Sequence, residues 1–220
     1  MDQQYNLGGD RMKSHNIKNI LFGLSLSAIA LMTSSVTFAA SVNQDATATF
    51  NLVAPTETLK LTEASDITFK DATISAEDIV TTNSNDVNIS IQELSGNAPG
   101  WQLSTKLSHF TGSTKGKQLT GAQLFYPSVT PTTTTSGDTS AILPNTLTTD
   151  NAFTGDDKGK VVSSGEDAVN IVTADVGKGY GSWTIQYPTD KIQLKIPAGN
   201  LQDTYTATLT YTLTDSPVSH

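Results

Sequence analysis

The sequence of 220 residues contains no cysteine. This absence excludes disulfide bonds, thiol catalysis, thiolate metal sites and attachment through a lipid-modified cysteine. Histidine is also scarce, because only three are present and only His109 lies in the body of the chain. A histidine cluster for zinc is therefore not available, and we expect the fold to be held together by core packing alone.

Positive charge is in short supply. The chain has 13 Lys and Arg residues against 21 Asp and Glu residues, which gives a formal net charge of −8. Removal of residues 1–39, predicted below, takes away three basic and two acidic residues, so the net charge becomes −9. Phosphate binding relies on Lys and Arg, and we therefore expect no nucleic-acid partner and no binding to anionic membranes. Neutral glycans and proteins remain suitable partners.

Long apolar runs are absent except for residues 20–32. Lys13 and Lys18 precede this run, and small residues follow it. A basic region, an apolar region and small residues in this order are typical of a secretory signal peptide. We predict that residues 1–39 are an upstream extension and a signal peptide, cleaved near Ala39–Ala40. The run is too short for a confident membrane span, so we expect an exported protein with no membrane span after cleavage.

Catalytic arrangements find little support in the residues present. A Ser-His-Asp arrangement would have to use His109, which no nucleophile-elbow sequence accompanies. The adjacent carboxylates Glu166-Asp167 and Asp156-Asp157 lie in turn contexts, where solvated surface acids are the simpler interpretation. The run Gly177–Gly181 precedes a predicted strand and opens no helix, so it is not a phosphate-binding loop. We expect a protein that is not an enzyme, with no catalytic residues, no metal site and no cofactor.

Alternation of apolar and polar residues is the main pattern present. It is clearest in residues 205–213, where Tyr, Ala and Leu alternate with four threonines. This pattern predicts a strand with one face in a core and the other in water. Residues 192–196 alternate in the same way, and residues 197–200 supply turn chemistry. We therefore predict that the two runs form the closing antiparallel pair of a sheet.

Shorter alternations predict further strands, at residues 46–52, 59–61, 67–69, 87–91, 101–107, 119–126, 169–171 and 183–187. The first two of these ranges would be joined by a turn at Pro55, and residues 75–78 are compatible with a helical turn. Residues 127–149 are rich in Thr, Ser and Pro, so we predict a mobile loop there. Because no long helical period appears, we predict a single all-β domain at residues 40–220, an antiparallel β-sandwich that is Ig-like or related.

The aromatic residues leave two interpretations open. Trp101 and Trp183 are the only tryptophans, and each opens a predicted strand after a glycine-rich turn. Large aromatic residues in sandwiches commonly anchor the core. Alternatively, one indole lies on an exposed face and stacks on sugar rings or fills a pocket of a partner.

Two spaced motifs carry a resemblance to a known family. The segment Gly100-Trp101-Gln102-Leu103, together with residues 205–217, resembles the WxL domain of Gram-positive surface proteins. Residues 179–185 and 196–199 are similar to the interior of that domain, and the resemblance covers most of the chain after the signal peptide. The sequence departs from the family at Tyr211, where the distal motif normally carries a second tryptophan.

The resemblance implies an extracellular protein that attaches non-covalently to the cell wall, with peptidoglycan or another wall polymer as the ligand. It also implies assembly with co-expressed surface proteins. The alternative function is an interaction module that holds another surface protein, with indirect retention at the wall. The candidate binding residues are Trp101, Leu103, Tyr205, Tyr211 and Leu213, to which we add Trp183. Each motif pair lies on one face of its strand, so the motifs line either a shared binding surface or a shared core.

Overall fold

The computed structural model describes residues 49–134 and 139–215. Apart from Thr49, these residues belong to one compact unit, Phe50–His220, and the predicted signal peptide at residues 1–39 lies outside them. The described residues form strands and one short 3-10 helix, η1 (Ser140–Ile142), without any α-helix, which confirms the predicted all-β class. Within these ranges no helix combines the length and the hydropathy that a membrane crossing requires.

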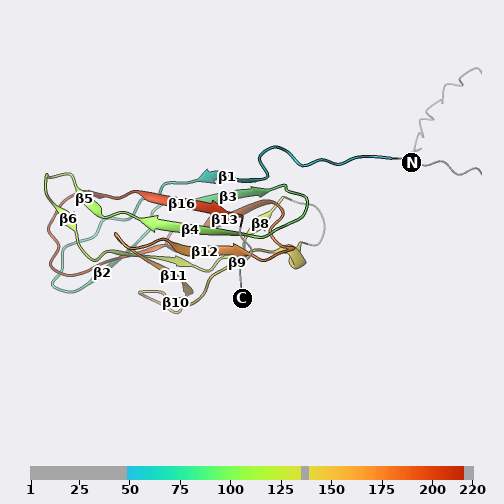
Figure 1. Ribbon diagram of the computed structural model, residues 1–220. Helices are drawn as coiled ribbons and strands as arrows, with labels where there is room; N and C mark the ends of the chain where they lie inside the picture. The colour runs from blue at the N-terminus through green and yellow to red at the C-terminus, as the bar shows by residue number, and fades with distance from the viewer. Residues whose placement is uncertain (1–48, 135–138, 216–220) are drawn as a thin grey trace, which may run out of the picture. The chain divides into compact units, whose positions relative to one another are not determined.

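Sixteen strands are present in the described residues (Figure 1). They are β1 (Leu59–Ala64), β2 (Ile79–Thr82), β3 (Val87–Glu93), β4 (Trp101–Leu107), β5 (Phe110–Gly112), β6 (Gln118–Leu119), β7 (Gln123–Pro127), β8 (Thr132–Thr133), β9 (Asn145–Thr146), β10 (Asp150–Asn151), β11 (Lys158–Ser163), β12 (Val169–Ala174), β13 (Gly181–Tyr187), β14 (Gln193–Ile196), β15 (Tyr205–Thr206) and β16 (Leu209–Thr214).

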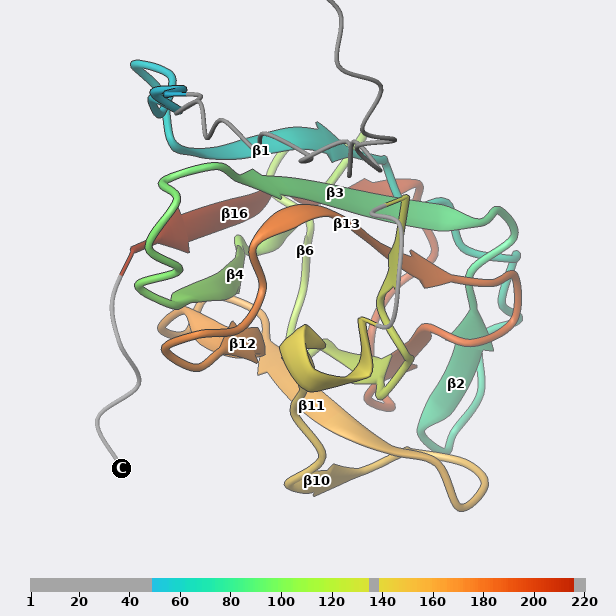
Figure 2. The same cartoon turned by 90° about the vertical axis from the view of Figure 1, so that its right-hand side faces the viewer.

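These strands form four sheets, and the pairings within each sheet are antiparallel. The β3 sheet has the order β1-β3-β13-β8, and the β4 sheet has the order β16-β4-β12-β9. The β7 sheet has the order β10-β11-β7-β14-β2, and the β5 sheet has the order β15-β5-β6. Figure 2 shows the strands of these sheets surrounding a common interior. The assignment to a two-layer sandwich stays a prediction.

The interior is filled from the central strands of the sheets. Along β3 and β4, and along β13 from Trp183 onward, every second residue is buried, as period 2 requires for a strand with one face in a core. The rings of Tyr126 (β7) and Tyr187 (β13) pack edge to face with their centroids 5.4 Å apart. The sequence alone predicted strands at 87–91, 101–107, 169–171 and 183–187, and β3, β4, β12 and β13 confirm them.

The prediction for the C-terminal strands is wrong in two respects. Strand β14 pairs with β2 and β7, whereas β16 pairs with β4, so the two runs do not form a closing pair. The alternating run 205–213 is also divided, because β15 pairs with β5 in a different sheet. The division has a local cause: the segment that pairs with residues 205–213 is interrupted between β4 and β5 at Ser108. The Ser108 hydroxyl accepts a hydrogen bond from the Thr208 N–H at 2.8 Å.

Several shorter predictions are also corrected. Strand β1 confirms the strand predicted at 59–61, but residues 49–58 form no strand, so the strand predicted at 46–52 is wrong in its described part. Residues 46–48 of that prediction lie outside the described part of the chain. Residues 67–69 contribute only an isolated bridge between Phe69 and Asn83. The run 119–126 is divided between β6 and β7. The described residues 75–78 contain bends without a helical turn.

The predicted loop at 127–149 is more structured than the sequence suggested. Its described residues include β8, η1 and β9, and Pro131 and Pro144 are buried. Strand β8 pairs with β13, and β9 pairs with β12, so the segment adds an edge strand to two sheets. Each pairing covers only two residues, which is consistent with a segment that has few apolar side chains to bury.

Candidate functional site

The two sequence motifs lie on neighbouring strands. Trp101 and Leu103 open β4, and Tyr211 and Leu213 lie on β16, its antiparallel partner. In the register of this pair, Leu213 is directly opposite Leu103, and Tyr211 is opposite Thr105. Residues opposite one another in a ladder project to the same face of the sheet, so all four motif side chains project to one face.

The candidate binding residues divide into two groups by burial. Trp101, Leu103 and Trp183 are buried, with exposed fractions of 0%, 0% and 1%. Tyr205, Tyr211 and Leu213 are half-buried and pack against the edge of the same core. In this conformation an external ligand cannot reach the two indole rings. A direct binding role for the six residues stays a prediction.

Tyr211 takes part in a small cluster of tyrosines. Its hydroxyl lies 3.0 Å from the hydroxyl of Tyr126, and these two groups form a hydrogen bond. Burial raises the pKa of Tyr126 well above its ordinary value, and the neighbouring Tyr211 raises it further. The pKa of Tyr211 is raised by burial as well. Both hydroxyls therefore stay neutral, and a tyrosine at position 211 supplies a hydrogen-bonding group to the core.

The two tryptophans hold one loop. The Trp101 indole N–H donates to the Gly179 carbonyl at 3.0 Å, and the Trp183 indole N–H donates to the Tyr180 carbonyl at 2.9 Å. These acceptors are consecutive in the loop between β12 and β13, which we call the indole-held loop (Asp175–Tyr180). A buried indole N–H needs an acceptor, so the packing of both rings is coupled to the position of this loop.

Gly179 permits the close contact between the loop and Trp101. Its φ of +69° lies in the left-handed region that glycine adopts without a steric penalty. A Cβ atom at this position would lie 2.5 Å from the Trp101 Nε1 atom and 2.5 Å from the Ala174 Cβ atom. The sequence therefore requires glycine here for two separate reasons, one conformational and one steric.

Other segments anchor the indole-held loop and leave part of it at the surface. The Gly177 N–H donates to the Ala98 carbonyl at 2.8 Å, and the Gly179 N–H donates to the Ile142 carbonyl at 2.7 Å. Val176 is 66% exposed, and Tyr180 is 43% exposed. The loop thus presents an apolar side chain and an aromatic ring on a backbone that several buried contacts fix in place.

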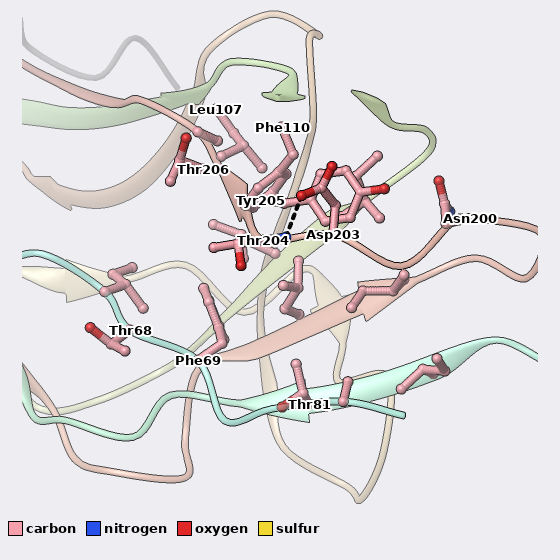
Figure 3. A pocket seen from close by; sticks show the side chains of 18 of the residues that line it. Thr68, Phe69, Thr81, Leu107, Phe110, Asn200, Asp203, Thr204, Tyr205 and Thr206 are labelled. Carbon is pink, nitrogen blue, oxygen red and sulfur yellow. Dashed lines mark hydrogen bonds between the residues drawn. The ribbon is translucent and has the colours of Figure 1, made fainter. Parts of the chain in front are cut away.

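A groove of about 820 Å³ lies beside the second motif (Figure 3). Residues of the segment 64–75 form one wall, and residues of the segment 197–211 form the other. Figure 3 shows Phe69 on one side, facing Leu107, Phe110 and Tyr205 on the other. We call this feature the edge groove; its apolar lining between the two segments, which we call its floor, includes Leu107, Phe110, Leu119, Leu124, Leu194 and Ile196. Two of the candidate residues, Tyr205 and Tyr211, line it.

Polar contacts fix the 197–211 wall. The Asp203 carboxylate accepts hydrogen bonds from the Ser113 hydroxyl, from the Thr114 N–H at 3.0 Å and from the Thr204 N–H at 2.8 Å. The hydrogen bond from Ser113 is the main reason that the pKa of Asp203 lies far below its ordinary value, since it stabilises the ionised form. The amide of Asn200 exchanges two hydrogen bonds with the Thr120 backbone.

Two of the residues considered for catalysis, His109 and Asp157, take part in a packing contact and an ion pair. The ring of His109 lies against Gly165, where an added Cβ would be 2.1 Å from the His109 Cε1 atom. Asp157 forms an exposed ion pair with Lys191 at 3.4 Å. Within residues 49–134 and 139–215, no group of three or more His, Cys, Asp and Glu side chains is placed to hold a metal ion.

Comparison with known proteins agrees with the motif positions. A family model described as a surface cell wall-binding WxL domain matches residues 39–217. The chain belongs to the WxL family. The match includes both motif strands, the indole-held loop and the edge groove. WxL domains are binding domains of the cell surface rather than a family of enzymes, and the family places this protein at the cell wall. Comparisons with curated proteins and with solved structures give no match.

Sequence reasoning did not single out the indole-held loop or the edge groove of this WxL domain. Tyr180 and Val176 were not candidates, although the glycines around them marked a loop that leads into β13. The signal available was the mixture of glycine with apolar residues in a segment that precedes a tryptophan. The edge groove left no comparable signal, because its walls come from segments that are more than 100 residues apart.

Proposed function

We propose that this WxL domain is exported and attaches non-covalently to the Gram-positive cell wall, with peptidoglycan as the ligand. We further propose that the contact surface is the indole-held loop, not the indole rings themselves. The observation that carries the proposal is the pair of indole hydrogen bonds to consecutive carbonyls of one loop. Trp101 of the motif and Trp183 then act as positioning residues for Tyr180.

The exposed part of the loop suits a glycan. One face of a sugar ring presents C–H groups, which pack favourably against an aromatic ring, while its hydroxyl groups bond to polar atoms nearby. Tyr180 offers a partly exposed ring, and Lys178 and Asp175 place charged groups beside it, paired at 3.1 Å. Because the backbone is already fixed, little conformational entropy is lost when a ligand binds.

Sedimentation with purified, protein-free sacculi tests this proposal. The protein used is the chain from Ala40 to His220, and we expect it to pellet with the sacculi. Tyr180→Ala is expected to weaken binding about tenfold, as one aromatic contact is lost. Tyr180→Phe keeps the ring and should bind nearly as the wild type does. Leu201→Ala is the matched control, since Leu201 is exposed but lies at the edge groove.

The outcomes separate the possibilities. If Tyr180→Ala pellets as the wild type does, the indole-held loop is not the contact surface, although the domain still attaches to the wall. Failure of the wild-type protein to pellet would contradict direct attachment. With a predicted net charge of −9, the protein gains little from anionic wall polymers, so binding should persist when the salt concentration is raised.

A second candidate function is an interaction module that assembles with other surface proteins and is retained at the wall indirectly. The edge groove favours it, because an open apolar floor is typical of a surface that receives another chain. In this case a sacculus preparation stripped of protein would not retain the domain, whereas one that kept its surface proteins would.

A further inference from the structure

One wall of the edge groove includes a free strand edge, that of β16, and the other includes the isolated bridge at Phe69. Strand β16 pairs only with β4, and Thr208 begins that pairing: its N–H donates to the Ser108 hydroxyl, and its carbonyl accepts from the Ser108 N–H at 2.9 Å. In an antiparallel ladder, alternate residues direct their backbone groups to opposite sides. Ala207, Leu209 and Tyr211 therefore direct their N–H and carbonyl groups away from β4, at the edge that borders the groove.

The opposite wall has the same character at Phe69. The Lys70 N–H donates to the Thr82 carbonyl at 2.9 Å, and the Ser84 N–H donates to the Thr68 carbonyl at 2.7 Å. These bonds lie on either side of Phe69, which lines the groove, so the N–H and carbonyl groups of Phe69 point away from residues 82–84 and take no part in that pairing. An extended segment in the groove would thus meet donors and acceptors on both walls and apolar side chains on the floor.

The chain carries a segment that fits this description. Residues Phe50–Thr58, which we call the N-terminal arm, precede β1 and form no strand. Phe50 is 84% exposed and Leu52 is 85% exposed, and the polar Asn51 separates them. In an extended conformation Phe50 and Leu52 project to one face. Residues 50–56 include no charged side chain, so their burial requires no desolvation of a charge.

The arm leads away from the groove of its own chain. Strand β1 runs from Leu59 to Ala64, and the groove wall begins only at Ala64. In Figure 1 the arm leaves the right-hand side of the strands, whereas β2, β5 and β6 lie at the left. We propose that the N-terminal arm of a second copy of this chain adds as a β-strand in the edge groove, with Phe50 and Leu52 on the apolar floor.

This form of association follows a known mode of recognition. Backbone hydrogen bonds to an exposed strand edge provide affinity, and pockets for alternate side chains provide specificity. The inserted segment would also cover the free edge of β16, which is otherwise available for uncontrolled pairing. The contact joins two different surfaces, so reciprocal exchange gives a closed dimer and one-way insertion gives a longer chain. The inference does not rest on wall binding.

Measurement of mass in solution tests the proposal. Light scattering on the chain from Ala40 to His220, over a range of concentrations, should give a mass at least about twofold above that of the monomer, and the mass should fall on dilution. The double variant Phe50→Asp/Leu52→Asp should weaken association by about 100-fold, since each side chain contributes at least tenfold. Asn51→Asp adds a charge to the other face of the same arm and should leave association nearly unchanged.

A peptide that spans residues 47–54 tests the groove directly. When it is added to the Phe50→Asp/Leu52→Asp protein, we expect slower hydrogen exchange at the Leu209 and Tyr211 amides. The same peptide with both aspartates should leave that exchange unchanged. A wild-type protein that is monomeric at every concentration would overturn the proposal. This holds even if the amides of its own arm are protected from hydrogen exchange. Equal loss of association in Asn51→Asp would also overturn it.

Discussion

The two halves of the WxL signature lie side by side on β4 and β16 but have different surroundings. Leu103 and Leu213 face each other across the ladder, yet Leu103 is fully buried and Leu213 only half-buried. The cause is the position of each strand: β4 has neighbours on both sides, whereas β16 is the edge of its sheet. Alternation therefore determines which face of a strand is apolar, and the sheet determines how completely that face is covered.

The same difference extends to the surfaces that the two halves support. Trp101 on the central strand is sealed in the core and holds the indole-held loop through its N–H group. Tyr211 on the edge strand bonds to Tyr126 and lines the edge groove. In our proposals the central half serves wall attachment and the edge half serves association of copies. The following predictions challenge this division, from the largest effect to the smallest.

Truncation of the two facing leucines should give the largest difference. Leu103→Ala leaves a cavity in a closed core, so we expect a loss of about 3 kcal/mol or more in the free energy of unfolding. Leu213→Ala removes a half-buried side chain and should cost about 1 kcal/mol. Denaturant unfolding at low protein concentration measures both. Equal losses of stability would mean that another copy covers β16 in solution. Both leucine variants would then be measured again in the protein that carries Phe50→Asp/Leu52→Asp.

A pair of glycines tests the fit between the indole-held loop and Trp101. Gly179→Ala combines a φ of +69° with a Cβ placed 2.5 Å from the Trp101 Nε1 atom, so we expect a loss of stability above about 2 kcal/mol. Gly177→Ala has a φ of +84° but open space around its Cβ, and should cost about 1 kcal/mol. Thermal unfolding of both variants gives the difference. Equal effects would show that the loop can move away from the indole.

The smallest effect concerns the wall of the edge groove at low pH. The Ser113 hydroxyl, with the Thr114 and Thr204 N–H groups, holds the pKa of Asp203 far below its value in the unfolded chain, about 3.9. Ionised Asp203 therefore stabilises the folded state above about pH 4, and this contribution is lost as the pH falls toward the folded pKa. Unfolding curves should show a weaker acid dependence for Asp203→Asn than for the wild type.

Asp156→Asn serves as the control for that experiment, because Asp156 is an exposed acid in a turn away from the groove. Its acid dependence should follow that of the wild type. If Asp203→Asn also follows the wild type, the hydrogen bonds around ionised Asp203 contribute little to the stability of the folded state.

Local pattern explains which parts of this fold could be predicted. Burial alternates over all seven residues of β3 and β4 and from Trp183 onward in β13, and the sequence locates all three strands. Pairing partners are not a local property. Residues 205–213 have the most regular alternation in the chain, but the interruption at Ser108 in a partner segment 100 residues away divides them between two sheets.

The candidate site was predictable to a similar extent. The motif identified the family and the residues that organise the fold, yet it did not indicate what each indole bonds to. The acceptor of the Trp101 N–H lies 78 residues away, in a loop that the sequence marks only as glycine-rich. Similarly, nothing near Asn83 predicts that its buried amide accepts from the Ile192 N–H and donates to the Pro188 carbonyl. Such contacts depend on the assembled sheets.

The shared loop of the two tryptophans also has an optical consequence. Trp101 and Trp183 are the only indole fluorophores in the chain, and both donate their N–H groups to the same short segment. A displacement of Gly179 and Tyr180 would alter the polarity around both chromophores at once, whereas none of the residues in these two hydrogen bonds lines the edge groove. The protein thus contains an intrinsic reporter that distinguishes a ligand at one surface from a partner at the other.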